Sequence, residues 1–327
     1  MDILFVTATR IGDAVLSTGL LGYLADRYPE AKITVAAGPD AAPLFQYAPR
    51  VVRVISMRKR AASLHWLELY VKVAGQAWDL VVDLRGSALA WLLWARERKV
   101  IDKADPGLHQ VRQLGRLFRL DPPPSPQLWL GPEPTVAAER LIAASAVPLP
   151  AELPPLLAIG PAANWRGKQW RGERFAELAV RLTASSGLFP GATVVVLAAE
   201  HERPQAQPLL AAIPSARLID LVGRTDLLTA AAVLKRCRMF IGNDTGVMHI
   251  AAAIGTPTLG LFGPSPIARY APWGLDTAVV RTADAPETMF GPGFNHLTTD
   301  TLMDSLPVAA VEAAAQRLWS RAASKAA

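Results

Sequence analysis

Short, almost continuous apolar runs alternate with helix-like segments along the chain, and they do so in two series. In the first series the runs are residues 3–8, 32–38, 51–56 and 79–86. In the second series they are residues 156–161, 192–200, 217–223, 239–244 and 257–264. Strands of this kind, separated by helices, are typical of parallel sheets that helices cover on both faces. The sequence therefore predicts an α/β protein with two doubly wound parallel sheets.

Periodicity predicts helices between these runs, over residues 14–28, 88–98, 135–146, 173–185, 229–237 and 246–255, with an alanine-rich helix at about 308–325. A chain of 327 residues is comfortable for two domains. Proline-rich segments, DPPPSPQ at 121–127 and PLPAELPP at 148–155, separate the two series. We place the boundary near residue 150, which gives domains 1–150 and 151–327, and expect the last helix to pack back on the N-terminal domain.

The formal net charge of +6 is concentrated in one region. From Arg50 to Arg119, fourteen Lys and Arg stand against six Asp and Glu. This excess indicates either a solvated surface or an anionic partner, such as nucleic acid, a phosphorylated sugar or an anionic membrane. The charge is not accompanied by a recognition motif or an aromatic stacking pattern, so we expect no nucleic-acid partner.

Cysteine content and apolar run length bear on the compartment. The chain has one cysteine, Cys237, so no internal disulfide forms, which fits a reducing compartment. No basic segment precedes the first apolar run, and no run approaches the length of a spanning helix. We therefore expect a cytoplasmic protein. LHWLELY at 64–70, with basic residues before it, fits either contact with a membrane interface or an ordinary packed helix.

Two segments lie where parallel α/β sheets bind ligands, directly after a strand and before a helix. TRIGDAVLST at 9–18 places Asp13 near a helix start, where it either caps the helix or takes a proton from a hydroxyl nucleophile. AANWRGKQWRGERF at 162–175 carries Lys168 among three arginines. This loop either binds a phosphate or forms a charged surface with Trp170 packed on the sheet.

A third segment of this kind is NDTGVMHIAAAIGTPTLGLFGPSP at 243–266. Asp244, Thr245 and Gly246 stand at a helix start, and His249 follows one turn later. Exposed N–H groups and a hydroxyl at such a place suit a diphosphate or a hydroxyl-rich ligand. A capped helix with a core histidine would show the same pattern.

Several common site motifs are missing from the sequence. It has no D-x-D pair for a metal that holds a nucleotide diphosphate and no Cys/His cluster for zinc. It also lacks a Walker loop, a G-x-G-x-x-G after a strand and a G-x-S-x-G elbow. The sequence thus offers no motif that would indicate a bound metal or cofactor, in agreement with the metal-independent reaction without a cofactor that the resemblance described next implies.

Four segments, in this order, resemble glycosyltransferase family 9, the ADP-heptose:lipopolysaccharide heptosyltransferases. RIGDAVLST at 10–18 resembles the family's R-x-G-D block, and DLRG at 83–86 resembles its D-L-x-G segment. GPAANWRGKQW at 160–170 is similar to the family's strand, small-residue loop and K-x-W. The segment at 243–266 is similar to its long block from D-[ST]-G to G-P-[ST].

The resemblance implies a GT-B fold, in which two Rossmann-like domains face each other across a cleft. It implies that the N-terminal domain takes the acceptor and the C-terminal domain the nucleotide sugar. The expected reaction is an inverting, metal-independent transfer of heptose from ADP-L-glycero-D-manno-heptose. The expected acceptor is the phosphorylated inner core of lipopolysaccharide, as lipid A–Kdo or heptosylated core, at the cytoplasmic membrane face.

The resemblance also implies roles for single residues. Asp13 matches the catalytic base, and Lys168 matches the lysine that meets the donor phosphate or sugar. The other donor-binding candidates are Asn164, Glu202, Gly223, Thr225, Asp244, Thr245, Gly246 and His249. Asn164 and its neighbour Ala163 stand where the family often has Thr or Ser, and Glu200 is the alternative to Glu202 at the ribose. The acceptor-binding candidates are Arg10, Gly12, Arg58, Arg60 and Arg85.

Two alternatives remain open from the sequence. One is a family 9 type glycosyltransferase that uses another nucleotide sugar or another acceptor glycan. The other is a nucleotide-sugar-binding protein without catalysis, against which the presence of Asp13, Lys168, Asp244 and His249 counts.

Overall fold

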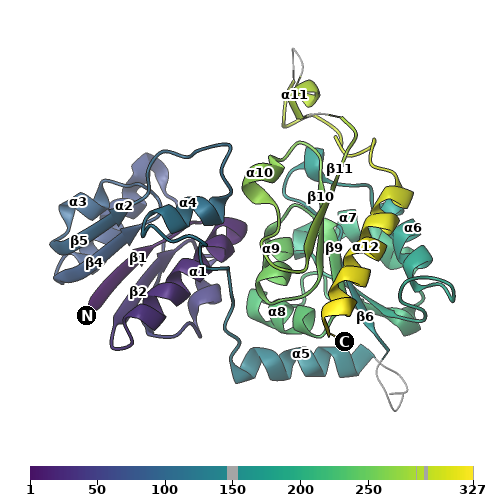
Figure 1. Cartoon of the computed structure of the whole chain (residues 1–327), viewed down its shortest axis with the longest axis horizontal. Coiled ribbons are helices and arrows are strands. Elements are labelled where there is room, and N and C mark those ends of the chain that lie inside the picture. The colour runs from purple at the N-terminus through teal and green to yellow at the C-terminus, as the bar shows by residue number, and fades with distance from the viewer. Residues whose placement is uncertain (146–153, 285, 291–293, 327) are drawn as a thin grey trace. The chain divides into compact units, whose positions relative to one another are not determined.

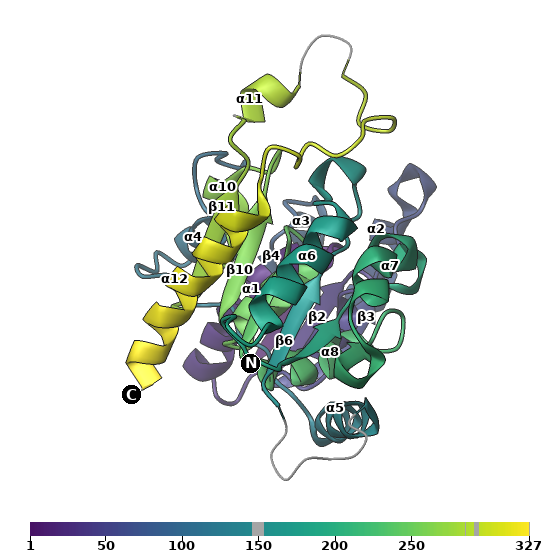
Figure 2. The ribbon, with the colours of Figure 1, turned by 90° about the vertical axis from the view of Figure 1, so that its right-hand side faces the viewer.

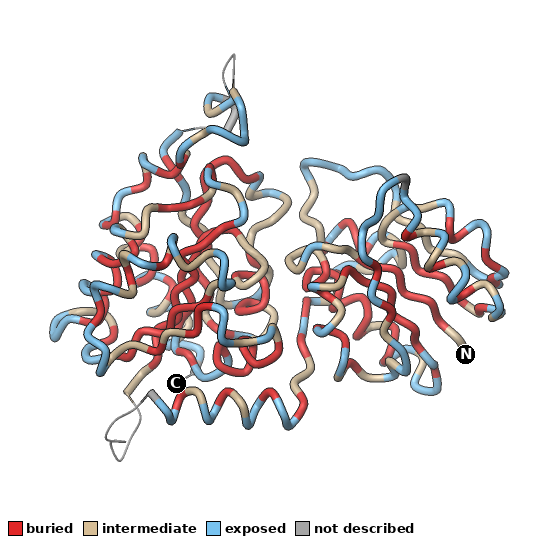
Figure 3. The backbone as a smooth tube through the Cα atoms, turned by 180° about the vertical axis from the view of Figure 1, so that it is seen from behind, coloured by how far each residue is buried: buried red, intermediate tan, exposed pale blue. Residues whose placement is uncertain are grey.

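The structure, a computed structural model, describes residues 1–145, 154–284, 286–290 and 294–326. Two units divide the chain between Gly131 and Pro132, and each is built on a parallel sheet (Figure 1). Figure 3 shows buried residues running along the strands of each sheet, as expected when helices cover both faces. No helix in the described part of the chain is long and apolar enough to cross a membrane.

The elements of the first unit are β1 (Asp2–Val6), α1 (Ile11–Arg27), β2 (Lys32–Ala37), β3 (Val51–Ser56), α2 (Leu64–Val73), β4 (Trp78–Asp83), α3 (Leu89–Leu92), β5 (Ala95–Val100) and α4 (Gln110–Arg116). The strand order is β3-β2-β1-β4-β5, and all pairs are parallel. The chain reverses direction across the sheet between β1 and β4. In doubly wound sheets, ligands bind at the carboxyl ends of the two strands that flank this switch point.

Two helical layers cover the first sheet. Helices α2 and α3 contribute to one buried cluster with Leu4, Val6 and Val81 of the strands. Helix α1 covers the other face, because the right-handed crossovers β1-α1-β2 and β4-α3-β5 run in opposite directions across the sheet. Helix α4 packs with α1 (Figure 1).

The prediction of one helix over residues 88–98 is wrong. Only Leu89–Leu92 are helical, and Ala95–Val100 form the edge strand β5. The guanidinium of Arg98 donates hydrogen bonds to the carbonyl oxygens of Ala90, Leu93 and Ala95, which a continuing helix would use internally. Charged side chains in ARERKV are tolerated because an edge strand is partly exposed to water.

The elements of the second unit are α5 (Pro132–Ser145), β6 (Leu156–Gly160), α6 (Gly172–Thr183), β7 (Thr193–Val196), α7 (Arg203–Ala212), β8 (Leu218–Asp220), α8 (Leu227–Lys235), β9 (Met239–Asn243), α9 (Gly246–Ala253), β10 (Thr258–Phe262), α10 (Ile267–Tyr270), β11 (Thr277–Arg281), α11 (Pro286–Met289) and α12 (Val308–Ala326). The strand order is β11-β10-β9-β6-β7-β8, again with parallel pairs. Its switch point lies between β6 and β9.

The helices of the second unit also form two layers. Residues of α6, α7 and α12 share one core cluster with the strands, and Figure 2 shows α12 beside α6. Helix α9 packs with α8 on the other face. Helix α12 contacts β10 and β11 of its own unit, and its expected packing on the N-terminal domain stays a prediction.

The predicted domain boundary near residue 150 falls in residues 146–153, outside the described residues. The contacts divide the chain earlier, between Gly131 and Pro132, because α5 packs against α8 and β8 of the second unit. A helix that follows the proline-rich segment therefore belongs with the residues after it.

Candidate active site

Asp13 lies in the first turn of α1, just after β1. It is the third residue of the helix, and the N-cap position is held by Arg10, whose side chain makes no capping hydrogen bond. Asp13 therefore does not occupy the N-cap position. Its carboxylate, partly exposed, lies in the turn where the helix dipole stabilises negative charge.

Arg85 follows β4, the strand beside β1 at the switch point. The buried carboxylate of Asp83 holds this turn by accepting hydrogen bonds from the backbone N–H groups of Arg85 and Ser87, at 2.8 and 2.9 Å. The Arg85 guanidinium lies over the ring of Trp66, 5.4 Å from its centroid. Its Nη1 is buried and has no hydrogen-bond partner in the described structure, so it retains a donor for an anionic or hydroxyl ligand.

The remaining acceptor-binding candidates divide by strand. Arg10 and Gly12 lie with Asp13 after β1, next to the strand that carries Arg85. Arg58 and Arg60 follow β3, the edge strand two positions away from β1. The side chain of Arg60 is exposed and pairs with Glu68 at 2.9 Å.

Lys168 and Asp244 meet at the switch point of the second sheet. Lys168 comes from the loop after β6, and Asp244 directly follows β9, which pairs with β6. The Lys168 Nζ lies 2.7 Å from Asp244 Oδ2, and the Asp244 Oδ1 lies 3.9 Å from His249 Nε2. Asp244 and His249 are buried, whereas about a quarter of the Lys168 side chain is exposed, at 26%. The ammonium is thus fixed by a buried carboxylate but stays accessible to a ligand.

Helix α9 begins at this ion pair without a side-chain cap. Thr245 is its N-cap in an extended conformation, and the hydroxyl makes no capping hydrogen bond. The first N–H groups of a helix have no partner within the helix, and together with the helix dipole they attract anions. Thr245 and Gly246 therefore present backbone donors beside the Lys168 ammonium.

Asn243 connects the two strands at this point and was not among the predicted residues. Its Nδ2 donates to the carbonyl oxygen of Pro161 at 2.8 Å, and its Oδ1 accepts from the backbone N–H of Trp170 at 3.2 Å. Asn243 is fully buried, so its amide ties the loop that carries Lys168 to the end of β9. Its position before the Asp-Thr-Gly sequence was the only available signal.

Glu202, Gly223 and Thr225 follow the next two strands of the sheet, β7 and β8. The Glu202 carboxylate accepts a hydrogen bond from the backbone N–H of Ala199 at 2.9 Å, within its own loop. Glu200 lies directly against Gly223, whose N–H donates to the carbonyl oxygen of Ala198 at 2.9 Å. The donor-binding candidates thus form a row along one edge, over the ends of β9, β6, β7 and β8.

Residues 163 and 164 begin the loop after β6. Asn164 is exposed, and the backbone of Ala163 is held on both sides. Its N–H donates to Oε1 of Gln205 at 3.0 Å, and its carbonyl oxygen accepts from Nε2 of Gln169 at 2.8 Å. Ala163 thus serves as a backbone anchor for the loop.

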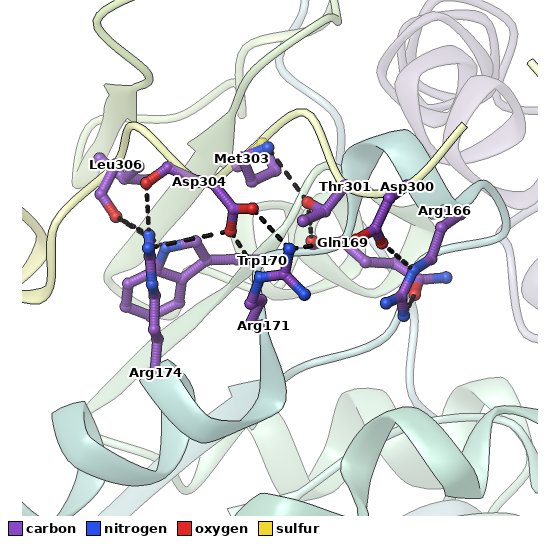
Figure 4. Close-up of polar contacts among 10 residues, drawn as sticks. All are labelled: Arg166, Gln169, Trp170, Arg171, Arg174, Asp300, Thr301, Met303, Asp304 and Leu306. Atoms are coloured by element: carbon purple, nitrogen blue, oxygen red, sulfur yellow. Dashed lines mark hydrogen bonds and ion pairs between the residues drawn. The ribbon is translucent and has the colours of Figure 1, made fainter.

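The loop that carries Lys168 is also held from the segment before α12 (Figure 4). Arg171 binds Asp304 through two hydrogen bonds, at 2.6 and 2.5 Å, and reaches Asp300 at 3.1 Å. Arg166 donates to Asp300 at 2.8 Å, and Arg174 donates to the backbone carbonyl oxygens of Asp304 and Leu306. The Thr301 hydroxyl donates to the carbonyl oxygen of Gln169.

These contacts change the acidity of the two carboxyls. The pKa of Asp300 is lowered to about 2, chiefly by the backbone N–H of Thr301 and then by Arg166 and Arg171. The pKa of Asp304 is also lowered, chiefly by its hydrogen bonds from Arg171. Because the arginines of the loop are bound by the segment before α12, we assign them a structural role. Trp170 is buried in the core beneath them, as expected if it packs on the sheet.

The sequence profile of glycosyltransferase family 9 (heptosyltransferase) matches residues 40–290, well over half of the chain. The chain belongs to glycosyltransferase family 9. It is therefore a glycosyltransferase, as the four motifs predicted.

Relatives and solved structures of family 9 cover most of the chain. The lipopolysaccharide heptosyltransferase 2 of Salmonella typhimurium is 28% identical over 298 residues, which is 81% of this chain and 83% of that protein. A family 9 glycosyltransferase structure from Veillonella parvula has a TM-score of 0.79 at 20% identity, over 98% of this chain and 97% of that one. The structure of E. coli ADP-heptose lps heptosyltransferase II has a TM-score of 0.76 at 22% identity, over 98% and 99%. The predicted GT-B fold class is thereby confirmed.

Among the residues that the structure describes, no three His, Cys, Asp or Glu side chains gather in a way that would hold a metal ion. The expectation of a reaction without metal stays a prediction that a chelator tests.

Proposed function

We propose that this family 9 enzyme transfers heptose from ADP-L-glycero-D-manno-heptose to the phosphorylated inner core of lipopolysaccharide. The observation that carries the proposal is the pairing of Lys168 with Asp244 beside the uncapped start of α9, at the switch point of the second sheet. A cation next to free helix N–H groups suits the diphosphate of a nucleotide sugar. The similarity to the heptosyltransferases of Salmonella typhimurium and E. coli supports heptose as the sugar and lipopolysaccharide as the acceptor.

In the proposed reaction, a hydroxyl oxygen of the acceptor attacks the anomeric carbon of the donor. Asp13 takes the hydroxyl proton as the new carbon–oxygen bond forms. The bond between the anomeric carbon and the diphosphate oxygen breaks on the opposite side, and ADP leaves with the electron pair. The configuration at the anomeric carbon is inverted, and no metal takes part.

The leaving diphosphate gains negative charge as that bond breaks. Lys168 and the N–H groups at the start of α9 stabilise this charge, and their fixed positions avoid reorganisation during the step. Farther along the same edge, Glu202 or Glu200 would meet the ribose hydroxyls, and Gly223 with Thr225 would border the adenine. Asp244 and His249 orient Lys168 and face the sugar.

The acceptor is proposed to bind the first unit. Arg85 retains a buried donor atom at the switch point there, and Arg10 is exposed two residues before Gly12. Arg58 and Arg60, after β3, would meet phosphate groups farther out on the core oligosaccharide. We propose that the enzyme works in the cytoplasm, with transient contact to the inner membrane face where a lipid-linked acceptor lies.

Calorimetric binding of ADP, UDP and GDP to the full chain tests the donor assignment. We expect ADP to bind most tightly, with the same affinity in EDTA. Lys168→Ala should weaken ADP binding by about tenfold to a hundredfold, because a charged hydrogen-bond donor is lost. Lys235→Ala, at the exposed end of α8, is the matched control. Preference for UDP or GDP would contradict the ADP-heptose donor, and loss of ADP binding in EDTA would contradict the metal-independent site.

A further inference from the structure

Helix α2 carries apolar side chains on its outer side as well as on its inner side. Leu69 and Val73 are buried in the core cluster beneath the helix. Leu64, Leu67 and Val71 follow one another at helical spacing and are 50%, 59% and 72% exposed. A surface helix normally carries polar residues on its outer side. The outer apolar stripe of α2 is therefore a feature that the fold of this unit does not require.

The turn from α3 into β5 presents a second group of exposed apolar side chains. Trp91, Leu92 and Trp94 are 68%, 67% and 81% exposed, although Leu93 between them is buried. The turn is held by Arg98, which donates to three of its carbonyl oxygens at 2.7, 2.9 and 2.7 Å. The backbone that carries these two exposed indole rings and the exposed leucine is thus held in place.

Both groups lie on one side of the first unit. Helices α2 and α3 cover the same face of the sheet and share one core cluster (Figure 1). The exposed side chains of the two groups are together called the apolar patch: Leu64, Leu67, Val71, Trp91, Leu92 and Trp94. Single exposed apolar residues are common, but a group of this size on one side marks an interaction surface.

The charges around the apolar patch are mainly positive. Lys59, Lys72 and Arg96 are exposed beside it, within the region that carries the excess of Lys and Arg. Glu68 and Glu97 are its nearby carboxylates, and each is neutralised by a basic partner at 2.9 Å. Apolar side chains with tryptophan, bordered by Lys and Arg, match the chemistry of an anionic membrane interface, where indole rings sit at the headgroup level.

We propose that the apolar patch docks the protein on the surface of an anionic lipid bilayer. Leu64, Leu67 and Val71 would enter the headgroup boundary along α2, and Trp91 with Trp94 would anchor the turn beside it. The neighbouring cations would attract the negatively charged lipids. The role of this docking in the reaction rests on the proposed function, because the enzyme would meet a lipid-linked acceptor at the bilayer surface.

Sedimentation of the full chain with vesicles tests the docking. The vesicles are phosphatidylcholine alone or phosphatidylcholine mixed with phosphatidylglycerol, at low and at high salt. We expect binding to the mixed vesicles at low salt and weaker binding at high salt. Trp91→Ser/Trp94→Ser should lower the partition coefficient of the protein between water and vesicles by about tenfold or more. The double variant lacks the two indole rings that wild-type docking transfers from water to the membrane interface.

Two further variants separate the contributions. Lys59→Gln/Arg96→Gln should weaken binding to the mixed vesicles and flatten its salt dependence. Leu275→Gln is the matched control, because Leu275 is 88% exposed in the second unit, and it should bind as the wild type does.

Three results would overturn the docking proposal. They are an absence of wild-type binding to mixed vesicles, equal binding by Trp91→Ser/Trp94→Ser, and a wild-type dimer that this double substitution converts to a monomer. The last result would mean that a second copy of the chain covers the patch. ADP calorimetry on the same samples reports on the donor site separately, so failure of either proposal is recognised without the other.

Discussion

At the scale of single residues, Gly223 shows why the end of β8 has the shape it has. Its φ is +70°, a conformation that residues with a Cβ adopt only with strain. A Cβ at this position would also lie 2.7 Å from Cβ and 2.9 Å from Cα of Glu200. Two requirements therefore select glycine here, the backbone angle and the close approach of the loop after β7.

A comparison of Gly223→Ala with Gly191→Ala separates these two requirements. Gly191 has a φ of +69° with nothing within 4 Å of an added Cβ, so Gly191→Ala measures the strain alone. We expect Gly191→Ala to lower the free energy of unfolding by about 1 kcal/mol and to leave ADP binding unchanged. Gly223→Ala should cost more stability and also weaken ADP binding severalfold, because Glu200 must move. Urea unfolding and calorimetry measure both; equal effects of the two substitutions would contradict the role given to the contact with Glu200.

At the scale of elements, the buried strands were easier to predict than the edge strands and the helices between them. The strands of both series appear in the structure because buried parallel strands are almost continuous apolar runs. The sequence ALAWLLWARER predicts a helix where the edge strand β5 lies, because it is apolar and then charged. The contacts of Arg98 that end the helix after one turn are not visible in this pattern. Strand β11 and helices α4 and α7 were not predicted either.

The same limit applies to the candidate site. Lys168 and Asp244 could be chosen from sequence because each follows a strand and precedes a helix. Asp300 and Asp304 lie about 130 residues from their arginine partners, in a segment without a strong helix or strand pattern. Their role in holding the Lys168 loop became apparent only from the fold.

The network of Asp300 and Asp304 predicts a dependence of stability on pH. The pKa of Asp300 is about 2 in the folded chain and that of Asp304 is lowered, against about 3.9 for an unfolded Asp. A carboxyl whose pKa is lowered by folding stabilises the folded state, and this stabilisation is complete at pH values above the pKa of the same carboxyl in the unfolded chain. That stabilisation is lost as the pH falls through the folded value.

Asp300→Asn/Asp304→Asn should therefore be less stable than the wild type at neutral pH, and the difference should shrink as the pH falls from about 4 toward 2. Denaturant unfolding followed by tryptophan fluorescence at several pH values measures it. Glu177→Gln removes an exposed pair with Arg181 on α6 and is the control, with little effect at any pH. A difference that stays constant down to pH of about 2 would show that these carboxyls are not held in the ionised form.

At the scale of the whole molecule, two sheets with the same arrangement carry different chemical groups. In each sheet the candidate residues follow the two strands that flank the switch point, Asp13 and Arg85 in the first unit, Lys168 and Asp244 in the second. The proposed base and the proposed phosphate-binding lysine thus belong to different units. In the proposed reaction, transfer requires both groups, whereas nucleotide binding requires only the second unit.

Asp13→Asn tests this division most directly, by turnover of ADP-heptose with a lipopolysaccharide core acceptor and by ADP calorimetry on the same protein. We predict a loss of turnover of about a hundredfold or more, as for a missing general base, with ADP affinity unchanged. Asp26→Asn, at the exposed end of the same helix, should retain the wild-type rate. Normal turnover by Asp13→Asn would contradict the account and leave Asp13 as an acid that only stabilises the start of α1.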